Sequence, residues 1–317
     1  DAQTNATTML IGEEKWMEVN KQKQTIAQLF YEGVYPRSEK IFDINRAILK
    51  GVSNIDEVKL VDMLPSSLDL IDIQEEVIKA PRGIFSVIRP VDLLDKSLRK
   101  IKQKYDYILI DCPPNLGVIT RNGLKVSDVY IIPTVPDVLS TYGIPQIISR
   151  VNKFSKELEK EIKPLGIVIT KYREQSALHK RTVKELRKER DCRVFETIFK
   201  ENDNIANAAE YINKSTMRQK WGYKGQVDNF KLLAEEIMRA MGDEYGKEIK
   251  GFIFDYGIRT SPQNAIKVTH QALDISPGGT IIGETTLNKL KNINYENFLQ
   301  KYKNIVKEND RNNPNYI

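Results

Sequence analysis

The chain has 317 residues, of which 40% are hydrophobic and 29% are charged, and its formal net charge is +6. These are ordinary values for a globular protein of the cytoplasm, and the positive charge suits a polyanionic partner without requiring one. No apolar run reaches the roughly 18 residues of a membrane span. The two cysteines, Cys112 and Cys192, are too few for a disulfide framework or a zinc site.

Short apolar runs rich in Val and Ile alternate with amphipathic segments along the chain. The runs are typical of parallel strands buried on both faces, and the segments between them are typical of helices. The expected strands are Val58–Met63, Tyr107–Ile110, Val129–Ile132 and Leu165–Ile169, and the expected helices are Leu68–Lys79, Leu93–Lys104, Ile144–Leu158 and Ala177–Arg190. This alternation predicts an α/β fold with a doubly wound, mostly parallel sheet, in which ligands bind outside the carboxyl ends of the strands.

The run Tyr105–Gly117, YDYILIDCPPNLG, delivers Asp111 into a Cys-Pro-Pro turn. A carboxylate that leaves a buried strand in this way suits a magnesium–nucleotide site. The alternative is an ordinary turn residue at the end of a strand. Three further runs accompany this motif in the sequence: DAQTNATT at the start, LVDMLPSSLDL from Leu60, and DVYIIPTVP from Asp128.

Taken in order, these motifs resemble the nucleotide core of the ParA/Soj partition ATPases. Asp1, Gln3, Asn5 and Thr7 match the family's D-x-Q-x-N-x-T segment, and Asp111, Pro113 and Pro114 match its I-D-x-P-P segment. The resemblance covers about residues 1–241 and ends in a helix at Phe230–Met241. It implies a fold of the P-loop NTPase type, with ATP and Mg²⁺ as ligands.

The family's phosphate loop has the form G-x-x-x-x-G-K-[ST], and no such run occurs in this sequence. We therefore expect an N-terminally truncated chain, a fragment of a longer protein, that is inactive by itself. The alternative is a natural relative that has lost ATPase activity.

The resemblance also assigns roles to single residues. Asp1 matches the catalytic switch aspartate that orients the attacking water, although an ordinary helix N-cap is the alternative. Asp111 would act on the shell of the metal ion. The nucleotide would contact Asn5, Thr170, Lys171 and Asn202. The loop Ile198–Asn202 departs from the family's I-P-x-N pattern at Lys200 and Glu201, so a DNA contact of that loop cannot be carried over.

A cationic stripe is expected along the helix from Ala177. At helical spacing its cations share one side, and Val183 and Leu186 point to the other. The stripe consists of Lys180, Arg181, Lys184, Arg187 and Lys188. We expect these residues to bind the DNA backbone, with a solvated helix face as the alternative. A second, less regular basic patch contains Lys214, Arg218, Lys220 and Lys224.

Residues 1–245 are expected to form the ATPase domain and residues 246–317 a C-terminal extension of unknown role. Within the extension, Tyr295–Val306 has the pattern of an amphipathic helix. Three uses of this helix are possible, in decreasing order of expectation. It packs onto the core, it binds in a groove of a partner protein or a second subunit, or it lies on a membrane surface.

The resemblance implies an ATPase that dimerises with ATP, binds DNA without sequence preference and drives plasmid or chromosome partitioning. Its partner would be a centromere-binding, ParB-like protein, and it would be cytoplasmic and associated with the nucleoid. The alternative is a MinD-like positioning ATPase that acts on a membrane or a protein assembly without binding DNA.

Overall fold

The structure is a computed structural model that describes residues 3–35, 37–58, 60–79, 90–113, 115–188 and 191–242, together with a few residues between 273 and 306. Two compact units are present: one comprises Asp1–Val194 and Ile198–Asp228, and the other comprises Phe195–Thr197 and Asn229–Ile317. We call them unit 1 and unit 2. The boundary predicted at residue 245 stays a prediction.

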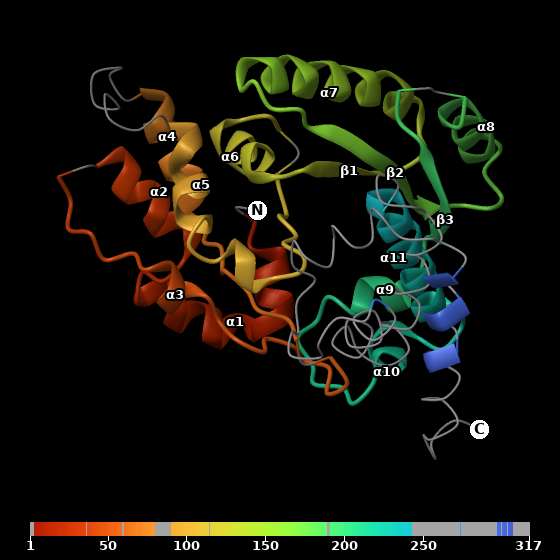
Figure 1. Cartoon of the computed structure of the whole chain (residues 1–317), viewed down its shortest axis with the longest axis horizontal. Coiled ribbons are helices and arrows are strands. Elements are labelled where there is room, and N and C mark those ends of the chain that lie inside the picture. Colours follow the sequence, from red (N-terminus) through yellow and green to blue (C-terminus); the bar gives the residue numbers. More distant parts are fainter. Residues whose placement is uncertain are drawn as a thin grey trace. The chain divides into compact units, whose positions relative to one another are not determined.

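The first half of unit 1 is helical (Figure 1). Its elements are α1 (Asn5–Lys21), α2 (Ile26–Val34), α3 (Ile44–Ala47), α4 (Asp69–Lys79), the 3-10 turn η1 (Pro90–Asp92), α5 (Leu93–Leu98), the 3-10 turn η2 (Lys102–Lys104) and α6 (Val118–Val126). Phe30 of α2, Leu70 of α4 and Leu93 of α5 are buried in one apolar cluster. Burying such side chains contributes about 1.5–3 kcal/mol each, which holds these short helices together.

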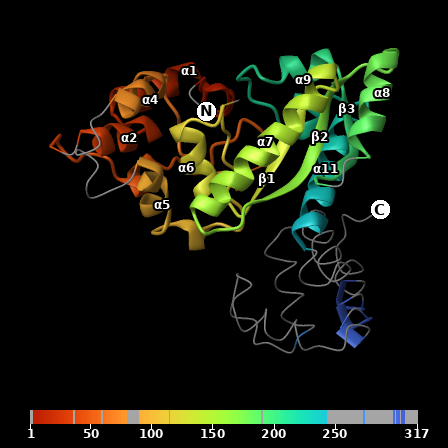
Figure 2. The same ribbon diagram turned by 90° about the horizontal axis from the view of Figure 1, so that it is seen from above.

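A parallel three-stranded sheet follows, in the order β1-β2-β3. Its strands are β1 (Val129–Thr134), β2 (Lys163–Tyr172) and β3 (Val194–Lys200), joined by the helices α7 (Val138–Glu157) and α8 (Ala177–Leu186). Ile132 pairs with Ile167, and Ile169 pairs with Ile198. Helix α7 lies along one face of the sheet (Figures 1 and 2). The predicted α/β fold with a parallel sheet is confirmed.

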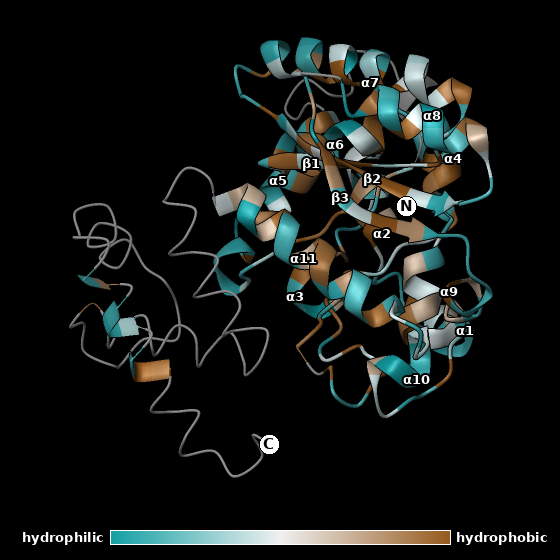
Figure 3. Ribbon diagram, turned by 90° about the vertical axis from the view of Figure 1, so that its right-hand side faces the viewer, coloured by the Kyte–Doolittle hydropathy of each residue, from teal (hydrophilic) through white to brown (hydrophobic). Residues whose placement is uncertain are grey.

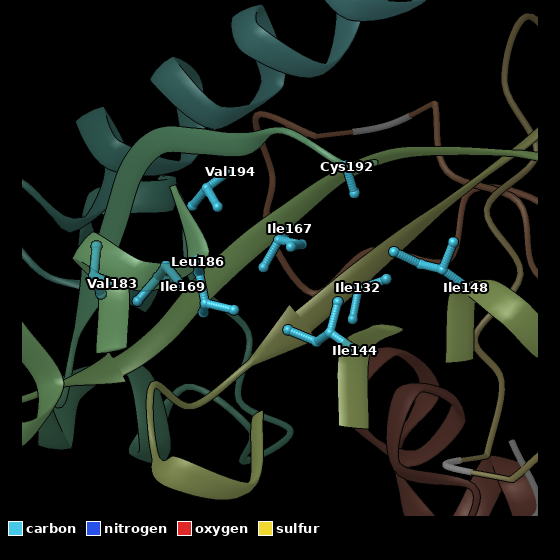
Figure 4. Packing of buried hydrophobic residues seen from close by; sticks show 9 residues of the cluster. All are labelled: Ile132, Ile144, Ile148, Ile167, Ile169, Val183, Leu186, Cys192 and Val194. Carbon is cyan, nitrogen blue, oxygen red and sulfur yellow. The ribbon is translucent and has the colours of Figure 1, made fainter. Parts of the chain in front are cut away.

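The core of the sheet consists mostly of the β-branched side chains of Ile and Val, together with Leu186 and Cys192 (Figure 4). Ile167 and Ile169 in the central strand are fully buried. Ile144 and Ile148 of α7, and Val183 and Leu186 of α8, pack against the same cluster. The run in β2 is continuously apolar because both faces of a parallel strand are covered.

Two of the predicted strands are wrong. Within Val58–Met63, the described residues are irregular except for an isolated antiparallel bridge from Met63 to Leu49. Tyr107–Ile110 forms no strand, and Leu109 is 91% exposed. A strand requires a neighbour for its backbone hydrogen bonds, and neither segment pairs with another strand among the residues that the structure describes.

Several predicted boundaries also need correction. The helix predicted from Ile144 begins at Val138, because the Asp137 side chain caps it by accepting from the Ser140 N–H at 2.9 Å. The helix predicted over Leu93–Lys104 ends at Leu98 and gives way to a turn and η2. Ile198–Lys200, predicted as part of a loop, belongs to β3.

The chain continues through α9 (Asp203–Asn207) and α10 (Met217–Trp221) to α11 (Gln226–Gly242), which contains the helix predicted at Phe230–Met241. In unit 2 the Glu236 carboxylate accepts from the N–H of Glu196 at 2.6 Å and of Thr197 at 2.8 Å. Those bonds fasten α11 to this part of β3.

Near the C-terminus, residues 297–298, 300–302 and 304–306 are helical, in agreement with the helix predicted there. The side chains of Phe298, Tyr302 and Val306 are buried. Packing within the protein therefore accounts for this part of the apolar stripe. None of the described helices combines the length and the apolar character that a membrane crossing requires.

Candidate functional site

The segment after Asp1 leads directly into α1. Asp1 itself lies outside the described residues; Gln3 and Asn5 are exposed, and the Asn5 amide donates to Gln3 Oε1 at 3.3 Å. Thr7 is buried, and its Oγ1 accepts from the Ser66 N–H at 3.1 Å. Two motifs distant in the sequence, the D-x-Q-x-N-x-T segment and the run around Ser66, are therefore in direct contact.

The turn that carries Asp111 packs on α6 and lies near α4. Asp111 is exposed, and Pro114 lies outside the described residues. A Cβ added to Gly123 of α6 would lie 3.0 Å from Cys112 Sγ, so α6 packs closely beneath the turn. Cys112 is partly buried, and this burial raises the pKa of its thiol.

Beyond Asp111, Asn115 and Gly117 shape the start of α6. Asn115 Oδ1 accepts from the Gly117 N–H at 2.9 Å, and a Cβ at Gly117 would lie 2.8 Å from Gln74 Nε2. Gln74 thus brings α4 to this turn. The sequence alone gave no indication of this approach, because it depends on how α4 packs against α6.

The carboxyl ends of β1 and β2 are joined by a hydrogen bond. Thr170 Oγ1 in β2 donates to the Thr134 carbonyl in β1 at 3.2 Å. The hydroxyl of Thr134 in turn donates to Ser140 Oγ at 3.0 Å. The Ser140 N–H and hydroxyl donate to Asp137 and hold the pKa of its carboxyl below the usual value. This strand end is therefore lined by hydroxyl groups in a fixed arrangement.

Lys171 and Asn202 occupy special backbone positions at the same end of the sheet. Lys171 has φ 50°, in the left-handed region that residues other than glycine rarely adopt. Backbone strain of this kind clusters at functional sites. Asn202 caps α9, with its Oδ1 accepting from the Asn204 N–H at 2.9 Å.

Lys200 and Glu201, the two residues that depart from the family's I-P-x-N pattern, form ion pairs across the ends of β2 and β3. Lys200 Nζ lies 2.7 Å from Glu174 Oε1, and Arg173 Nε lies 2.7 Å from Glu201 Oε2. Each of these two residues therefore has an oppositely charged partner after β2. The backbone N–H of Arg173 also donates to Nδ1 of the buried His179 at 3.1 Å, which ties the loop to α8.

Helix α8 contains both hydrophilic and hydrophobic residues (Figure 3), and it ends at Leu186, earlier than the predicted Arg190. Of the predicted cationic stripe, Lys180, Arg181 and Lys184 lie in α8, whereas Arg187 and Lys188 follow its last residue; Val183 and Leu186 are buried. The five members of the stripe are all exposed. Lys188 forms an ion pair with Glu185 at 2.8 Å. The predicted segregation of charged and apolar faces is present in the structure.

The second predicted basic patch differs from expectation. Lys220 is buried and donates to the Glu210 carbonyl at 2.7 Å, and burial lowers its pKa. Arg218 pairs with Asp228 at 3.3 Å. These two cations act within the fold, so the patch offers less charge to a partner than the sequence suggested.

No group of three or more His, Cys, Asp or Glu side chains gathers as a metal cluster in the part of the chain that the structure describes. A site built on a single carboxylate such as Asp111 still fits Mg²⁺, which keeps several waters and uses one or two carboxylates together with substrate phosphates.

The parallel sheet, with polar residues at the carboxyl ends of its strands, defines an α/β protein of the kind that binds ligands at that edge. The family model AAA_31, described as an AAA domain, matches residues 1–164. The chain belongs to this AAA-domain family, and its similarity to Soj and ParA proteins confirms the resemblance in its motifs.

Among curated proteins, the chain is similar to the sporulation initiation inhibitor protein Soj of Bacillus subtilis (strain 168), with 28% identity over 154 residues, 49% of this chain and 58% of the relative. It is also similar to the chromosome partitioning protein ParA of Myxococcus xanthus (strain DK1622), with 26% identity over 155 residues, 49% of this chain and 52% of the relative. The chain thus spans little more than half the length of these relatives.

Among solved structures, apo McdA from Cyanthece matches with a TM-score of 0.57 and 18% identity, over 75% of this chain and 84% of the McdA chain. This likeness is one of fold. It extends past the 164 residues that the family model matches.

Proposed function

We propose that this chain is part of a ParA/Soj-type ATPase that dimerises with ATP, binds DNA without sequence preference and drives the partitioning of a plasmid or chromosome. The observation that carries the proposal is the match of residues 1–164 to the family, with partition proteins among the similar relatives. The protein would act in the cytoplasm on the nucleoid, with a ParB-like protein on the cargo as its partner.

The nucleotide site that we propose would combine the turn at Asp111 with the carboxyl ends of β1 and β2. Asp111 would hold Mg²⁺ through water, which suits its exposed position. When bound, Mg²⁺ neutralises negative charge on the phosphates. Asn5, Thr170, Lys171 and Asn202 would contact the nucleotide, and Asp1 would orient the attacking water. The fixed hydroxyl of Thr170 and the strained backbone of Lys171 support this placement.

The DNA surface that we propose is the exposed side of α8. Lys180, Arg181 and Lys184 lie on a helix anchored by Val183 and Leu186, and the exposed Arg187 and Lys188 follow directly after its end. Each phosphate that a protein neutralises steepens the dependence of log K on log salt by about 0.9. A dimer would present the stripe twice.

The experiment is DNA binding with ATP by a form of the protein that carries a phosphate loop ahead of Asp1. Replacing Lys184 and Arg187 by Glu should weaken binding to unrelated duplexes alike and flatten the salt slope by at least about two units. Lys96 and Lys100, exposed in and after α5, provide the control: their reversal to Glu makes the same change in net charge. Binding by the control should stay near that of the parent.

An unchanged affinity and slope in the α8 variant would show that the stripe is only a solvated face. Binding of the parent to anionic vesicles without binding to DNA would instead favour a MinD-like positioning protein. ATP-driven dimerisation should persist in both variants, because all four replaced side chains are exposed and none is buried in the core.

A further inference from the structure

Helix α1 is broken at Gly12, which has φ 77° and ψ 164° inside the helix. This backbone region is accessible almost only to glycine. The break separates a first part, which contains Asn5 and Thr7, from a second part that continues to Lys21. The direction of the first part is therefore set at Gly12 as well as by its own contacts.

Sharp helix breaks have identifiable causes, such as proline or an inserted side chain. Here α1 contains no proline, and the ring of Tyr211 lies against Gly12. A Cβ at Gly12 would lie 2.7 Å from Tyr211 Cδ1 and 2.9 Å from Cε1. One turn earlier, the Met9 carbonyl accepts from the Asn54 side-chain amide at 3.2 Å. A ring and an amide from distant segments thus brace the break.

The two braces are joined to each other. The Asn54 carbonyl accepts from the Lys214 N–H at 2.8 Å, and the Asp56 N–H donates to the Lys214 carbonyl at 2.9 Å. Tyr211 and Lys214 belong to the segment that follows α9, the helix capped by Asn202. Three segments of unit 1 therefore meet at one junction. They are the first part of α1, the residues around Asn54 and the segment that follows α9.

We propose that Tyr211 is a positioning residue, whose ring on Gly12 holds the first part of α1 in place relative to the segment that begins at Asn202. Tyr211 is 46% exposed, and its ring lies where a Cβ of residue 12 would otherwise stand. The inference rests on the proposed function where it treats Asn5 and Asn202 as nucleotide contacts. The junction would keep those two contacts at a constant separation.

The test is amide hydrogen exchange in the 317-residue chain. In Tyr211→Ala, amides of residues 5–11 should exchange about tenfold faster, since local opening there loses its brace. Tyr211→Phe keeps the ring and should exchange like the parent. Amides of β2 should be unchanged in both variants. Equal exchange of residues 5–11 in the parent and Tyr211→Ala would overturn the proposal, as would equal acceleration by Ala and Phe.

Gly12→Ala changes the contact between Gly12 and Tyr211 from the side of α1. This variant can be used if Tyr211→Ala does not fold. It should also speed exchange of residues 5–11, because alanine is strained at φ 77° and its Cβ would meet the Tyr211 ring. No acceleration in Gly12→Ala would overturn the proposal independently. These readouts need no nucleotide or DNA, so a failure of the junction and a failure of the partition function are distinguishable.

Discussion

Residues 129–200 and residues 105–113 both carry apolar, β-forming runs, but only the first region forms a sheet among the described residues. In the first, β2 lies between β1 and β3 and Ile167 is completely buried. In the second, Tyr107–Ile110 pairs with no described strand, and Leu109 is 91% exposed. The two runs have similar side chains and differ in whether a neighbouring strand is present.

The comparison separates two requirements for a buried strand. Side-chain pattern makes burial favourable, whereas backbone N–H and C=O groups need partners before a segment can leave water. Residues Val129–Lys200 meet both requirements because two helical crossovers, α7 and α8, place three parallel strands side by side. The turn at Asp111 is consequently carried by its packing on α6, through Cys112 and Gly123, and not by a sheet.

The largest expected effect is on stability, and it distinguishes the sheet from residues 105–113. Ile167→Ala should lower the free energy of opening β2 by about 2–5 kcal/mol, because it leaves a cavity in a core where the side chain is fully buried. Leu109→Ala should change it by less than about 0.5 kcal/mol. Native-state hydrogen exchange of the β2 amides measures both. Similar losses in the two variants would mean that residues 105–113 are buried like the sheet.

A smaller effect is expected at the start of α7. Asp137→Ala removes the N-cap and should cost about 1 kcal/mol near pH 7. The pKa of Asp137 is lowered in the folded state, so its contribution is present above the unfolded pKa of 3.8 and is lost as pH falls through the lower folded pKa.

The Asp137→Asn variant separates the cap from the charge. Asparagine caps as well as aspartate but does not titrate, so it should lose little stability and remove this pH dependence. Urea unfolding of parent and variants at about pH 7 and about pH 3 tests both statements. Identical pH dependence in Asp137→Asn and the parent would contradict the role of the carboxylate.

The smallest effect is expected at the ion pairs that join the ends of β2 and β3. Arg173→Ala should leave the urea midpoint without resolvable change, because Arg173 and Glu201 are 63% and 50% exposed and water screens their attraction. A clear destabilisation would show that this edge of the sheet depends on charge as well as on apolar packing.

Much of the fold was predictable from local pattern. The runs Val129–Ile132 and Leu165–Ile169 and the amphipathic helices between strands are readable, because burial imposes the same periodicity on any parallel sheet. Local pattern could not show that Val58–Met63 and Tyr107–Ile110 form no strand, because strand pairing depends on a second segment. The break at Gly12 was equally hidden, because a lone glycine in a helical run has several possible reasons.

The sequence identified the motifs of the candidate site, but it did not predict how these motifs contact one another in space. Asp111 and the five cations of the stripe are exposed, as their proposed roles require. The contact of Thr7 with Ser66 and the ion pairs of Lys200 and Glu201 arise only when distant segments meet. Sequence spacing indicates which residues carry the chemistry, and packing decides which of them can act together.

The most direct test of the account is Mg²⁺-dependent ATP binding and hydrolysis by a form that carries a phosphate loop, with Asp1→Ala and Asp111→Ala compared with the parent. Asp1→Ala should retain ATP binding and lose turnover, because its carboxylate is needed only when water attacks. Asp111→Ala should weaken the Mg²⁺-dependent part of ATP binding itself. Parental turnover in Asp1→Ala, or Mg²⁺-dependent affinity equal to the parent in Asp111→Ala, would contradict the account.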